Sequence, residues 1–477
     1  MPRSKSPAPA RQAPRTGNGP AAHRGGSTGG VVWSWLVAVV ECVTTHYALR
    51  VTQLWFDWPI YLLKRLWDYW PHVAWDGYLN EEGVHLTRSV PYGAGPAERM
   101  HVLQPQAMAA AAAGAAGAAA AAARPPVVVY VHGGGFVCTC REMYYCSMCF
   151  LARRGCVVYV ADYPLAPQGR HPLPLLSILR CLAHLKAGRG AAAVHLIGDS
   201  AGANLALLAA AVAATPSLRA QLVSTLRGAS VRCSGSGGGA AAAASAAVAA
   251  AAAAEVAAMD LPKVHSACSI YGMLDRQSPA RTTFPVGAGL QYLWRLHGDE
   301  LGGGGGEGEG EAALPVAFGS VLGDPRVQVP PLLLCVGTAD PLEPSSHAVF
   351  EAMAARAAGS SASPPLARGV TAEPVELEVY EGAFHGFFGM PAGWTLLACG
   401  ARVSAAPCGE RVWEWLLRFC PADERPRSAM AKQGPRKLAR GWYGVLVISQ
   451  IAVAIPLAIV LAPFALWQLL AAVLAYA

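Results

Sequence analysis

The sequence predicts an α/β fold with a mostly parallel central sheet and helices on both faces of that sheet. Three observations carry this prediction. Short runs rich in β-branched residues recur along the chain, Ala/Leu-rich segments lie between them, and most of the runs are nearly continuously apolar. A strand that is apolar on both sides is buried on both faces, as in a parallel sheet covered by helices. The 477 residues are enough for one large domain of this kind.

The elements follow one another in strand–helix alternation. Six runs are predicted to be strands of the sheet: 126–132, 156–163, 193–199, 264–272, 330–340 and 375–382. Helices are expected between them, the clearest at 172–186, 202–213 and 345–356. In a sheet of this type the reactive groups lie at the carboxyl ends of the strands. Polar residues that directly follow a strand are therefore the first candidates for a site.

Low-complexity stretches interrupt this alternation. Four are predicted to be expanded surface loops: 107–123, 228–258, 302–311 and 355–365. Long surface insertions cost a fold little, since loop-closure entropy grows slowly with length. The alanine-rich ones are also compatible with partial helix. With these insertions included, the catalytic domain is predicted to span 81–425.

The amino-terminal region has a different composition. Residues 1–30 are predicted to be a disordered basic leader, with a transit peptide as the alternative. Residues 31–80 are apolar and aromatic, and they are predicted either to associate with a membrane or to cap the core domain. Within them, 31–49 is a weak candidate for a membrane span because Glu41 and His46 interrupt it.

The carboxyl-terminal residues 442–477 are predicted to be a transmembrane anchor. They carry no charged side chain, and a helical span needs only ~20 apolar residues. Pro456 and Pro463 allow either one kinked helix or a short hairpin. The basic linker 426–441 favours a cytosolic catalytic domain, whereas a span at 31–49 would place it in a lumen. The endoplasmic reticulum is the expected membrane, with a plastid as the alternative, and membrane lipids are expected partners.

The charge and cysteine patterns argue against two classes of function. Eleven Lys and Arg residues and no acidic residue lie in 1–40 and 425–440, so the net charge of +7 comes from the flanks of apolar segments. This is not the pattern of a nucleic-acid-binding face. Among the thirteen cysteines, Cys146 and Cys149 have CxxC spacing, but no second CxxC completes a metal site. We therefore expect free thiols, no metal and no cofactor. The oligomeric state is not defined by the sequence.

The stretch "GDSAG" at 198–202 is the strongest chemical signal. It follows a predicted strand and opens a predicted helix, which is the setting of a nucleophile elbow with Ser200 as the nucleophile. The glycines let strand and helix approach closely, and the helix amino terminus favours negative charge. A serine-capped tight turn is the structural alternative.

A serine nucleophile needs a base, and the base needs an acid to orient it. In this architecture the acid and the histidine follow the serine in chain order. Asp340 is the last residue of the predicted strand run 330–340, just past its apolar part, and His385 follows the next strand, so we predict a Ser200–His385–Asp340 triad. Other residues of the same types are weaker candidates because of their positions: Asp275, Asp324, His265 and His347.

The glycine run in "VVVYVHGGGFV", residues 127–137, fits the same chemistry. When a serine attacks an acyl carbon, the oxyanion needs N–H donors ~2.7–3.1 Å away, and side chains would block that approach. Gly133 and Gly134, together with Ala201 after the nucleophile, are therefore predicted to form the oxyanion hole. His132 is predicted to brace this loop.

Taken together, these motifs resemble the α/β-hydrolase-fold esterases and lipases of the hormone-sensitive-lipase type. Five motifs occur in order over about 125–420: "HGGGF", "DYPLAP", "GDSAGANLA", "GTADPL" and "FHGF". The resemblance implies a cap over the active site, built partly from the amino-terminal segment. Pro164 and Gln168 depart from the family's DYRLAPE motif, and Pro344 replaces an acid after "DPL". The short sequence "APQG" also resembles isoprenylcysteine methylesterase-like enzymes, which have the same fold.

These observations predict a membrane-anchored serine hydrolase that cleaves carboxylic esters, with a lipophilic ester as the substrate. An acylglycerol, an acetylated sterol and a prenylcysteine methyl ester all fit that class. Acyl transfer or amide hydrolysis by the same triad is the alternative. A non-catalytic scaffold on the same fold would be expected to lack a triad residue, and this chain has all three.

Overall fold

The computed structural model describes ten parts of the chain: 79, 82–112, 124–137, 139–235, 240–277, 286–298, 313–359, 373–383, 385–388 and 405–426. All of them belong to one compact unit, residues 58–477. The predicted leader, the predicted anchor, the Gly-rich run at 302–311 and nearly all of 31–80 and 426–441 lie outside the described residues.

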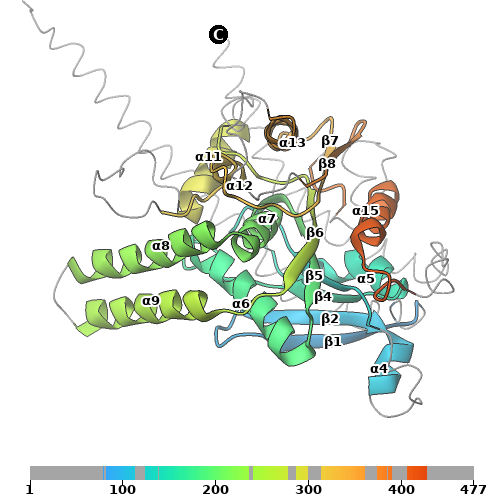
Figure 1. Cartoon of the computed structure of the whole chain (residues 1–477), viewed down its shortest axis with the longest axis horizontal. Coiled ribbons are helices and arrows are strands. Elements are labelled where there is room, and N and C mark those ends of the chain that lie inside the picture. Colours follow the sequence, from blue (N-terminus) through green and yellow to red (C-terminus); the bar gives the residue numbers. More distant parts are fainter. Residues whose placement is uncertain are drawn as a thin grey trace, which may run out of the picture. The chain divides into compact units, whose positions relative to one another are not determined.

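An eight-stranded sheet forms the centre of the described fold (Figure 1). Its strands lie in the order β1-β2-β4-β3-β5-β6-β7-β8. Their bounds are β1 Val84–Pro91, β2 Arg99–Pro105, β3 Val127–Val131, β4 Val157–Ala161, β5 Ala193–Asp199, β6 Lys263–Ile270, β7 Leu332–Gly337 and β8 Val375–Tyr380. Strands β3 to β8 pair in parallel, and β2 is antiparallel to both β1 and β4.

The six predicted strands are confirmed as β3 to β8. Strands β1 and β2 form an edge hairpin that was not predicted. Both sequences mix charged and apolar residues. β1 is the outermost strand, and only its first residue, Val84, is buried, whereas β2 is mostly buried but begins with an exposed arginine. Continuous apolar runs identify strands buried on both faces, so this antiparallel edge gives a weaker signal.

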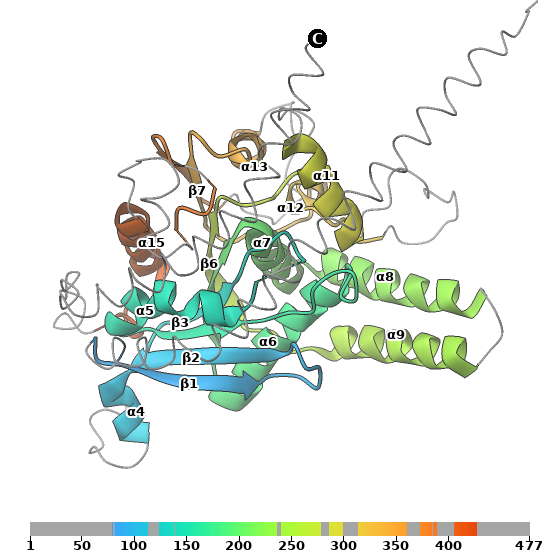
Figure 2. The same ribbon diagram turned by 180° about the vertical axis from the view of Figure 1, so that it is seen from behind.

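Helices cover both faces of the sheet (Figures 1 and 2). On β3, Val129 and Val131 point into one core, while Val128 and Tyr130 point into the other. The first core is closed by α6, α7, α8 and α13, and the second by α5 and α15. The bounds are α5 Tyr145–Arg153, α6 Leu173–Arg189, α7 Ser200–Ala214, α8 Pro216–Gly235, α13 Glu343–Ala357 and α15 Ala405–Phe419.

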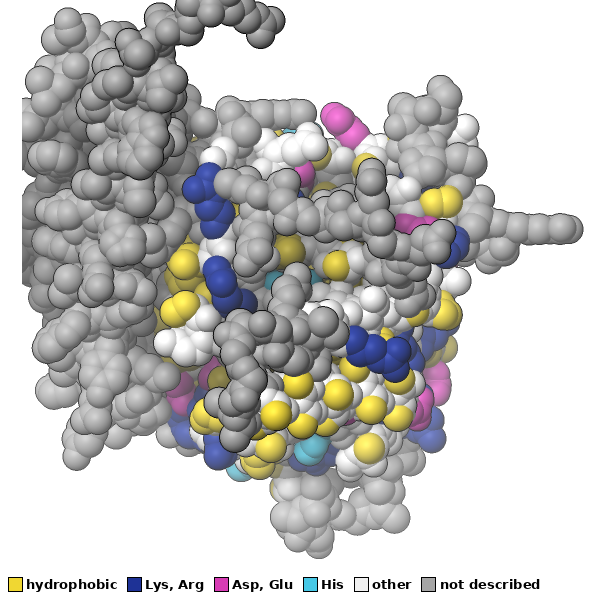
Figure 3. Space-filling view, turned by 90° about the vertical axis from the view of Figure 1, so that its left-hand side faces the viewer, with side chains coloured by type: hydrophobic (Ala, Val, Ile, Leu, Met, Phe, Trp, Pro, Cys, Tyr) yellow, Lys and Arg dark blue, Asp and Glu magenta, His cyan; other side chains and the backbone are white. Residues whose placement is uncertain are grey.

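The Ser/Gly/Ala run at 228–258 is mostly helical, which corrects the predicted surface loop. Helix α8 continues to Gly235, and α9, Ala240–Ala258, packs against it. Alanine has the highest helix propensity, so the composition that looked like a loop is strongly helix-forming. Helices α8 and α9 together form a helical hairpin, called the α8–α9 hairpin below, which extends from the body in Figure 1. Figure 3 shows that side of the molecule with its hydrophobic side chains in yellow.

Other low-complexity residues are also helical at their edges. Helix α4, Gln106–Ala112, contains the start of the alanine run at 107–123, and α13 contains the first residues of 355–365. Within the described ranges, no single helix is both long and apolar enough to cross a membrane. Among the described helices, one bent pair, α7 together with residues 216–228 across a bend of 113°, meets the test of length and composition.

Candidate active site

Ser200 lies in a strained turn between β5 and α7. Its φ of +50° is in the left-handed region, which L-residues other than glycine rarely adopt. A Cβ at Gly202 would lie 2.2 Å from the carbonyl oxygens of Val131 and His132, and one at Gly198 would lie 2.5 Å from the Gly202 oxygen. The two glycines therefore let β3, β5 and α7 approach closely enough to form the turn.

The structure brings Ser200, His385 and Asp340 together, although they are far apart in the sequence. His385 Nε2 lies 3.0 Å from Ser200 Oγ. On the other side of the ring, His385 Nδ1 lies 3.0 and 3.1 Å from the two carboxylate oxygens of Asp340. Asp340 follows β7 and His385 follows β8, so both side chains are delivered by adjacent parallel strands at the same sheet edge.

The three side chains differ in their exposure to solvent. Asp340 is buried, and its Oδ1 also accepts a hydrogen bond from Leu342 N at 2.8 Å. Ser200 is 7% exposed, whereas the His385 side chain is 36% exposed. The Tyr271 ring packs edge-on against the imidazole at 4.9 Å. The carboxylate is thus shielded from water, while the imidazole can be reached by a substrate or a water molecule.

The glycine loop after β3 lies against Ser200, but one of its N–H groups is used differently from the prediction. A Cβ at Gly133 would lie 3.0 Å from Ser200 Cβ, so the loop backbone passes directly beside the nucleophile. Gly133 N, however, donates to Asp199 Oδ1 at 2.6 Å. Because this N–H is paired with a carboxylate, Gly133 is not an available oxyanion donor. Gly134 and Ala201 stay as the predicted donors.

Asp199 is a structural anchor that the sequence analysis missed. It is buried, and its Oδ1 also accepts a hydrogen bond from the Tyr130 hydroxyl at 2.7 Å. Burial raises the pKa of the Asp199 carboxyl, while the hydrogen bonds from Tyr130 and the Gly133 N–H act in the opposite direction. The signal was present in "GDSAG", where an acidic residue sits inside an otherwise small and apolar turn.

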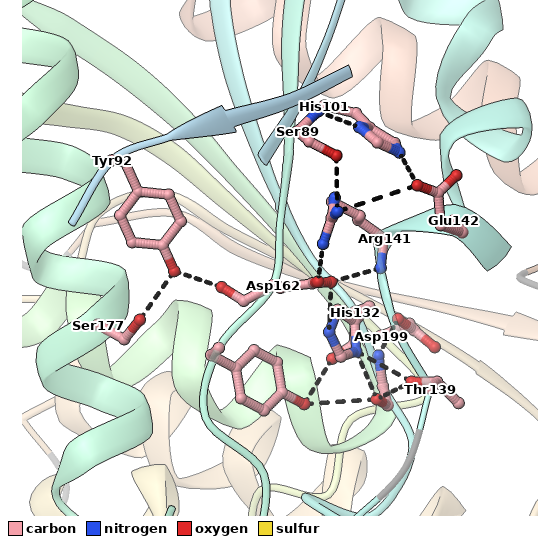
Figure 4. A network of polar contacts seen from close by, with 12 residues as sticks. Ser89, Tyr92, His101, His132, Thr139, Arg141, Glu142, Asp162, Ser177 and Asp199 are labelled. Atoms are coloured by element: carbon pink, nitrogen blue, oxygen red, sulfur yellow. Dashed lines mark hydrogen bonds and ion pairs between the residues drawn. The ribbon is translucent and has the colours of Figure 1, made fainter. Parts of the chain in front are cut away.

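His132 braces the loop from its other side, as predicted. Its ring is stacked on Tyr163 at 4.5 Å, and its Nδ1 lies 2.9 Å from Gly133 O. The Thr139 hydroxyl donates to the same carbonyl oxygen at 2.7 Å. Figure 4 shows Thr139, His132 and Asp199 gathered around this part of the chain.

Beyond His132, a chain of charged groups leads away from the loop (Figure 4). His132 Nε2 lies 3.4 Å from Asp162 Oδ1, and Asp162 forms an ion pair with Arg141. The carboxylate of Glu142, the residue after Arg141, lies 2.7 Å from Nε2 of His101, which is a residue of β2. Burial alone would raise the pKa of Asp162, but His132 and Arg141 outweigh it, so this pKa lies below its ordinary value. Asp162 therefore stays charged at neutral pH.

Helix α11, Val286–His297, covers the glycine loop from above. Leu293 packs against Gly135, and the rings of Trp294 and His297 contact the Phe136 ring at 5.5 and 3.7 Å. The cap segment expected from 31–80 lies, apart from Leu79, outside the described residues. No role was predicted for the residues of α11, which lie between the predicted strand 264–272 and the Gly-rich run 302–311.

The competing acids and histidines have other contacts. Asp324 pairs with Arg326, and Asp275 accepts a hydrogen bond from Gln277 N. The remaining two are His347, which lies 3.6 Å from Glu343, and His265, whose ring packs near His195. Among the described residues, no group of three or more His, Cys, Asp or Glu side chains is arranged to hold a metal ion.

Comparisons with known proteins agree on the fold. Residues 128–229 match the sequence model of a family described as having the α/β hydrolase fold. This match and the observed sheet confirm the α/β-hydrolase fold that the motifs predicted. No curated protein sequence matches the chain.

Among solved structures, similar chains include three esterases. Esterase B from Lactobacillus rhamnosis is 15% identical, with 73% of this chain and 93% of that chain covered and a TM-score of 0.47. Esterase LipW from Mycobacterium marinum is 20% identical, with 78% and 89% covered and a TM-score of 0.42. An esterase from the bacterial hormone-sensitive lipase family is 20% identical, with 71% and 85% covered and a TM-score of 0.42.

Proposed function

We propose that this chain is a carboxylic ester hydrolase that works through a Ser200–His385–Asp340 triad. One observation carries the proposal: a continuous set of hydrogen bonds joins the Ser200 hydroxyl, the His385 ring and the buried Asp340 carboxylate, with each heavy-atom distance near 3.0 Å. The serine sits in a strained elbow, where backbone strain is characteristic of functional residues.

In the proposed mechanism each of the three groups has its own role. Ser200 Oγ attacks the ester carbonyl carbon, and His385 Nε2 takes the hydroxyl proton as the bond forms. Asp340 accepts the Nδ1–H of His385, which keeps the ring in the tautomer that leaves Nε2 free to act as a base. His385 then returns the proton to the leaving alcohol. Water hydrolyses the acyl-enzyme by the same steps, so no cofactor takes part.

The oxyanion is stabilised by the N–H groups of Gly134 and Ala201. Ala201 lies in the first turn of α7, where N–H groups have no partner within the helix and the helix dipole favours negative charge. Gly134 precedes the part of the loop that α11 covers, and its φ of +102° suits a residue without a Cβ.

The proposed substrate is lipophilic and the proposed location is a membrane. The apolar, uncharged segment 442–477 and the basic residues before it support both parts of this proposal. A domain held at a membrane surface by such an anchor would meet its substrates in the lipid phase. By the same charge pattern, the catalytic domain faces the cytosol.

The decisive experiment is hydrolysis of p-nitrophenyl esters, from acetate to palmitate, by membranes that carry the full chain or a variant. Ser200→Ala and His385→Ala are each expected to lower kcat at least ~10⁴-fold, because triad members act as a unit. His347→Ala is the matched control, since His347 is a partly exposed histidine on α13. Its activity should equal the wild-type value.

A second readout does not depend on the choice of ester. A fluorophosphonate should label the wild type at Ser200 and should not label Ser200→Ala. If the folded wild type neither turns over any ester nor reacts with the probe, the hydrolase proposal is wrong. Labelling without turnover of any ester would rule out the ester substrate while keeping the nucleophile.

A further inference from the structure

The carbonyl oxygen of Gly133 has three polar partners, although the proposed mechanism gives this oxygen no part in the reaction. Three groups surround its oxygen: the Thr139 hydroxyl at 2.7 Å, His132 Nδ1 at 2.9 Å and the Tyr163 hydroxyl at 3.4 Å. The Thr139 contact is the shortest of the three, and Thr139 Oγ1 also lies 3.0 Å from His132 Nδ1.

This carbonyl belongs to the same peptide group as the Gly134 N–H. The Gly133–Gly134 bond is trans, because the cis bonds of the described residues both precede proline. A trans peptide is planar, so its C=O and N–H point in opposite directions. A group that fixes the direction of the Gly133 oxygen therefore also fixes the direction of the Gly134 N–H, on the opposite side of the peptide.

Without such a contact, this peptide would be easy to rotate. Glycines flank it on both sides, and glycine limits φ and ψ less than any other residue. Rotation of the peptide plane would turn the Gly134 N–H away from an oxyanion, while the rest of the fold stayed in place. A glycine run leaves room for a carbonyl oxygen to approach, but it supplies no orientation of its own.

The backbone of Thr139 is itself strained. Its φ is +72°, which is a clear outlier for a β-branched residue. A residue in this conformation is strained, and such strain persists where the surroundings hold the backbone in place. Glycine or asparagine would fit this φ better, yet neither would place a hydroxyl on the Gly133 oxygen in the same way.

We propose that Thr139 is a positioning residue for the oxyanion hole: its hydroxyl, donated to Gly133 O, orients the Gly134 N–H toward the substrate carbonyl oxygen. This inference rests on the proposed function and deepens it. His132 supports the same carbonyl, and the ion pair of Asp162 with Arg141 holds His132 from behind. Thr139 does not touch the reacting atoms and acts through the Gly133–Gly134 peptide.

Three variants of the full chain separate this role from a structural one. Thr139→Val keeps the shape but loses the hydroxyl, Thr139→Ser keeps the hydroxyl, and Thr139→Gly relieves the positive φ while losing the hydroxyl. The matched control is Thr215→Val, because the buried Thr215 hydroxyl likewise joins two segments, accepting from Gln328 N at 2.8 Å. Thr215 lies at the far end of α7 from Ser200.

Loss of an oxyanion donor costs about 10²–10³-fold in kcat, and misdirecting one donor should cost part of that. We expect Thr139→Val and Thr139→Gly to lower kcat ~10-fold or more, with KM changed less than about twofold. Thr139→Ser should retain more than half of the activity. Thr139→Gly should be at least as thermally stable as the wild type and still slow, which is a result that a purely structural role does not produce.

The rate of fluorophosphonate labelling at Ser200 provides the same comparison without an ester. It should fall by a similar factor in Thr139→Val and Thr139→Gly, because the phosphonyl oxygen occupies the oxyanion site. If Thr139→Val fails to fold, Thr139→Gly carries the test alone. Thr215→Val should lower the melting temperature and leave both rates unchanged.

Two results would overturn the inference. The first is wild-type kcat and labelling rates in Thr139→Gly, and the second is a Thr139→Ser variant as slow as Thr139→Val. If the wild type labels but cleaves no ester, the substrate part of the proposed function fails, and the labelling rates of the variants still decide the role of Thr139. If Ser200 does not label at all, both proposals fail together.

Discussion

The carboxyl edge of the sheet and the α8–α9 hairpin are both rich in glycine and alanine, for different physical reasons. At the sheet edge, a Cβ on Gly202 would lie 2.2 Å from two backbone oxygens. In the hairpin, a Cβ on Gly228 would meet nothing within 4 Å, and most of the described alanines of α9 are exposed. Small residues at the edge are required by close backbone contact. In the hairpin, the alanines only need to form helix, and no neighbour requires the glycine at position 228.

The largest effect should come from adding one methyl group at the edge. Gly202→Ala is expected to destabilise the fold by about 3 kcal/mol or more, because backbone atoms of β3 cannot move aside as a side chain can. Activity should be lost as well, since Gly202 is two residues from Ser200. Urea unfolding and ester turnover measure the two effects. A stable and active Gly202→Ala variant would show that the elbow tolerates a wider β3–α7 spacing.

Acid should weaken the sheet region, where histidines are buried. Burial lowers the pKa of His195 on β5 to about 3 and that of His171 before α6 to about 4. Below pH 6.5 the unfolded chain therefore binds protons that the folded chain does not, so stability falls as the pH falls. The slope is about 1.4 kcal/mol per pH unit for each histidine, or about 2 kcal/mol each between pH 6.5 and 5. The hairpin sequence, 216–258, contains no histidine.

Thermal unfolding at pH 7, 6 and 5 measures this dependence. His195→Asn should show a smaller loss of stability between pH 7 and 5 than the wild type. His347→Asn is the control, because the His347 side chain is 41% exposed, and its pH dependence should match the wild type. An unchanged slope in His195→Asn would mean that other groups cause the acid sensitivity.

The smallest effect should come from the same methyl group placed in the hairpin. Gly228→Ala in α8 is expected to raise the free energy of unfolding by up to ~1 kcal/mol, because alanine replaces glycine inside a helix and meets no atom. Ester turnover should be unchanged. A loss of stability comparable to that of Gly202→Ala would remove the distinction between the two regions.

Much of the fold could be predicted from the sequence, for a physical reason. Five of the six parallel strands, β3 to β7, are mostly buried, so each appears as a largely apolar run. The sixth, β8, is the partly exposed strand at the other edge of the sheet and carries two glutamates, and it was found as well. The edge strands β1 and β2 are mixed in composition and were missed. The run at 228–258 was predicted to be a surface loop, with partial helix as the alternative, because its low complexity resembles a linker; it is mostly helical because alanine favours helix.

The candidate site shows the same division. Chain order and strand ends were enough to select Ser200, Asp340 and His385, and the structure places them in contact. The roles of Asp199 and Thr139 could not be predicted, because each depends on which atom faces which across the glycine loop. The predicted use of the Gly133 N–H as an oxyanion donor failed for the same reason, since the donor was already paired with Asp199.

The sequence by itself determined the order of elements, the residue types of the triad and the need for glycine beside the nucleophile. These depend on burial pattern and on chain order, which are properties of the chain read in one dimension. Only the tertiary structure decided that the Gly133 N–H is paired with Asp199 and that the Thr139 hydroxyl holds the Gly133 carbonyl. Those are questions of direction within a few ångströms, and direction is set by the packing of segments that the sequence keeps far apart.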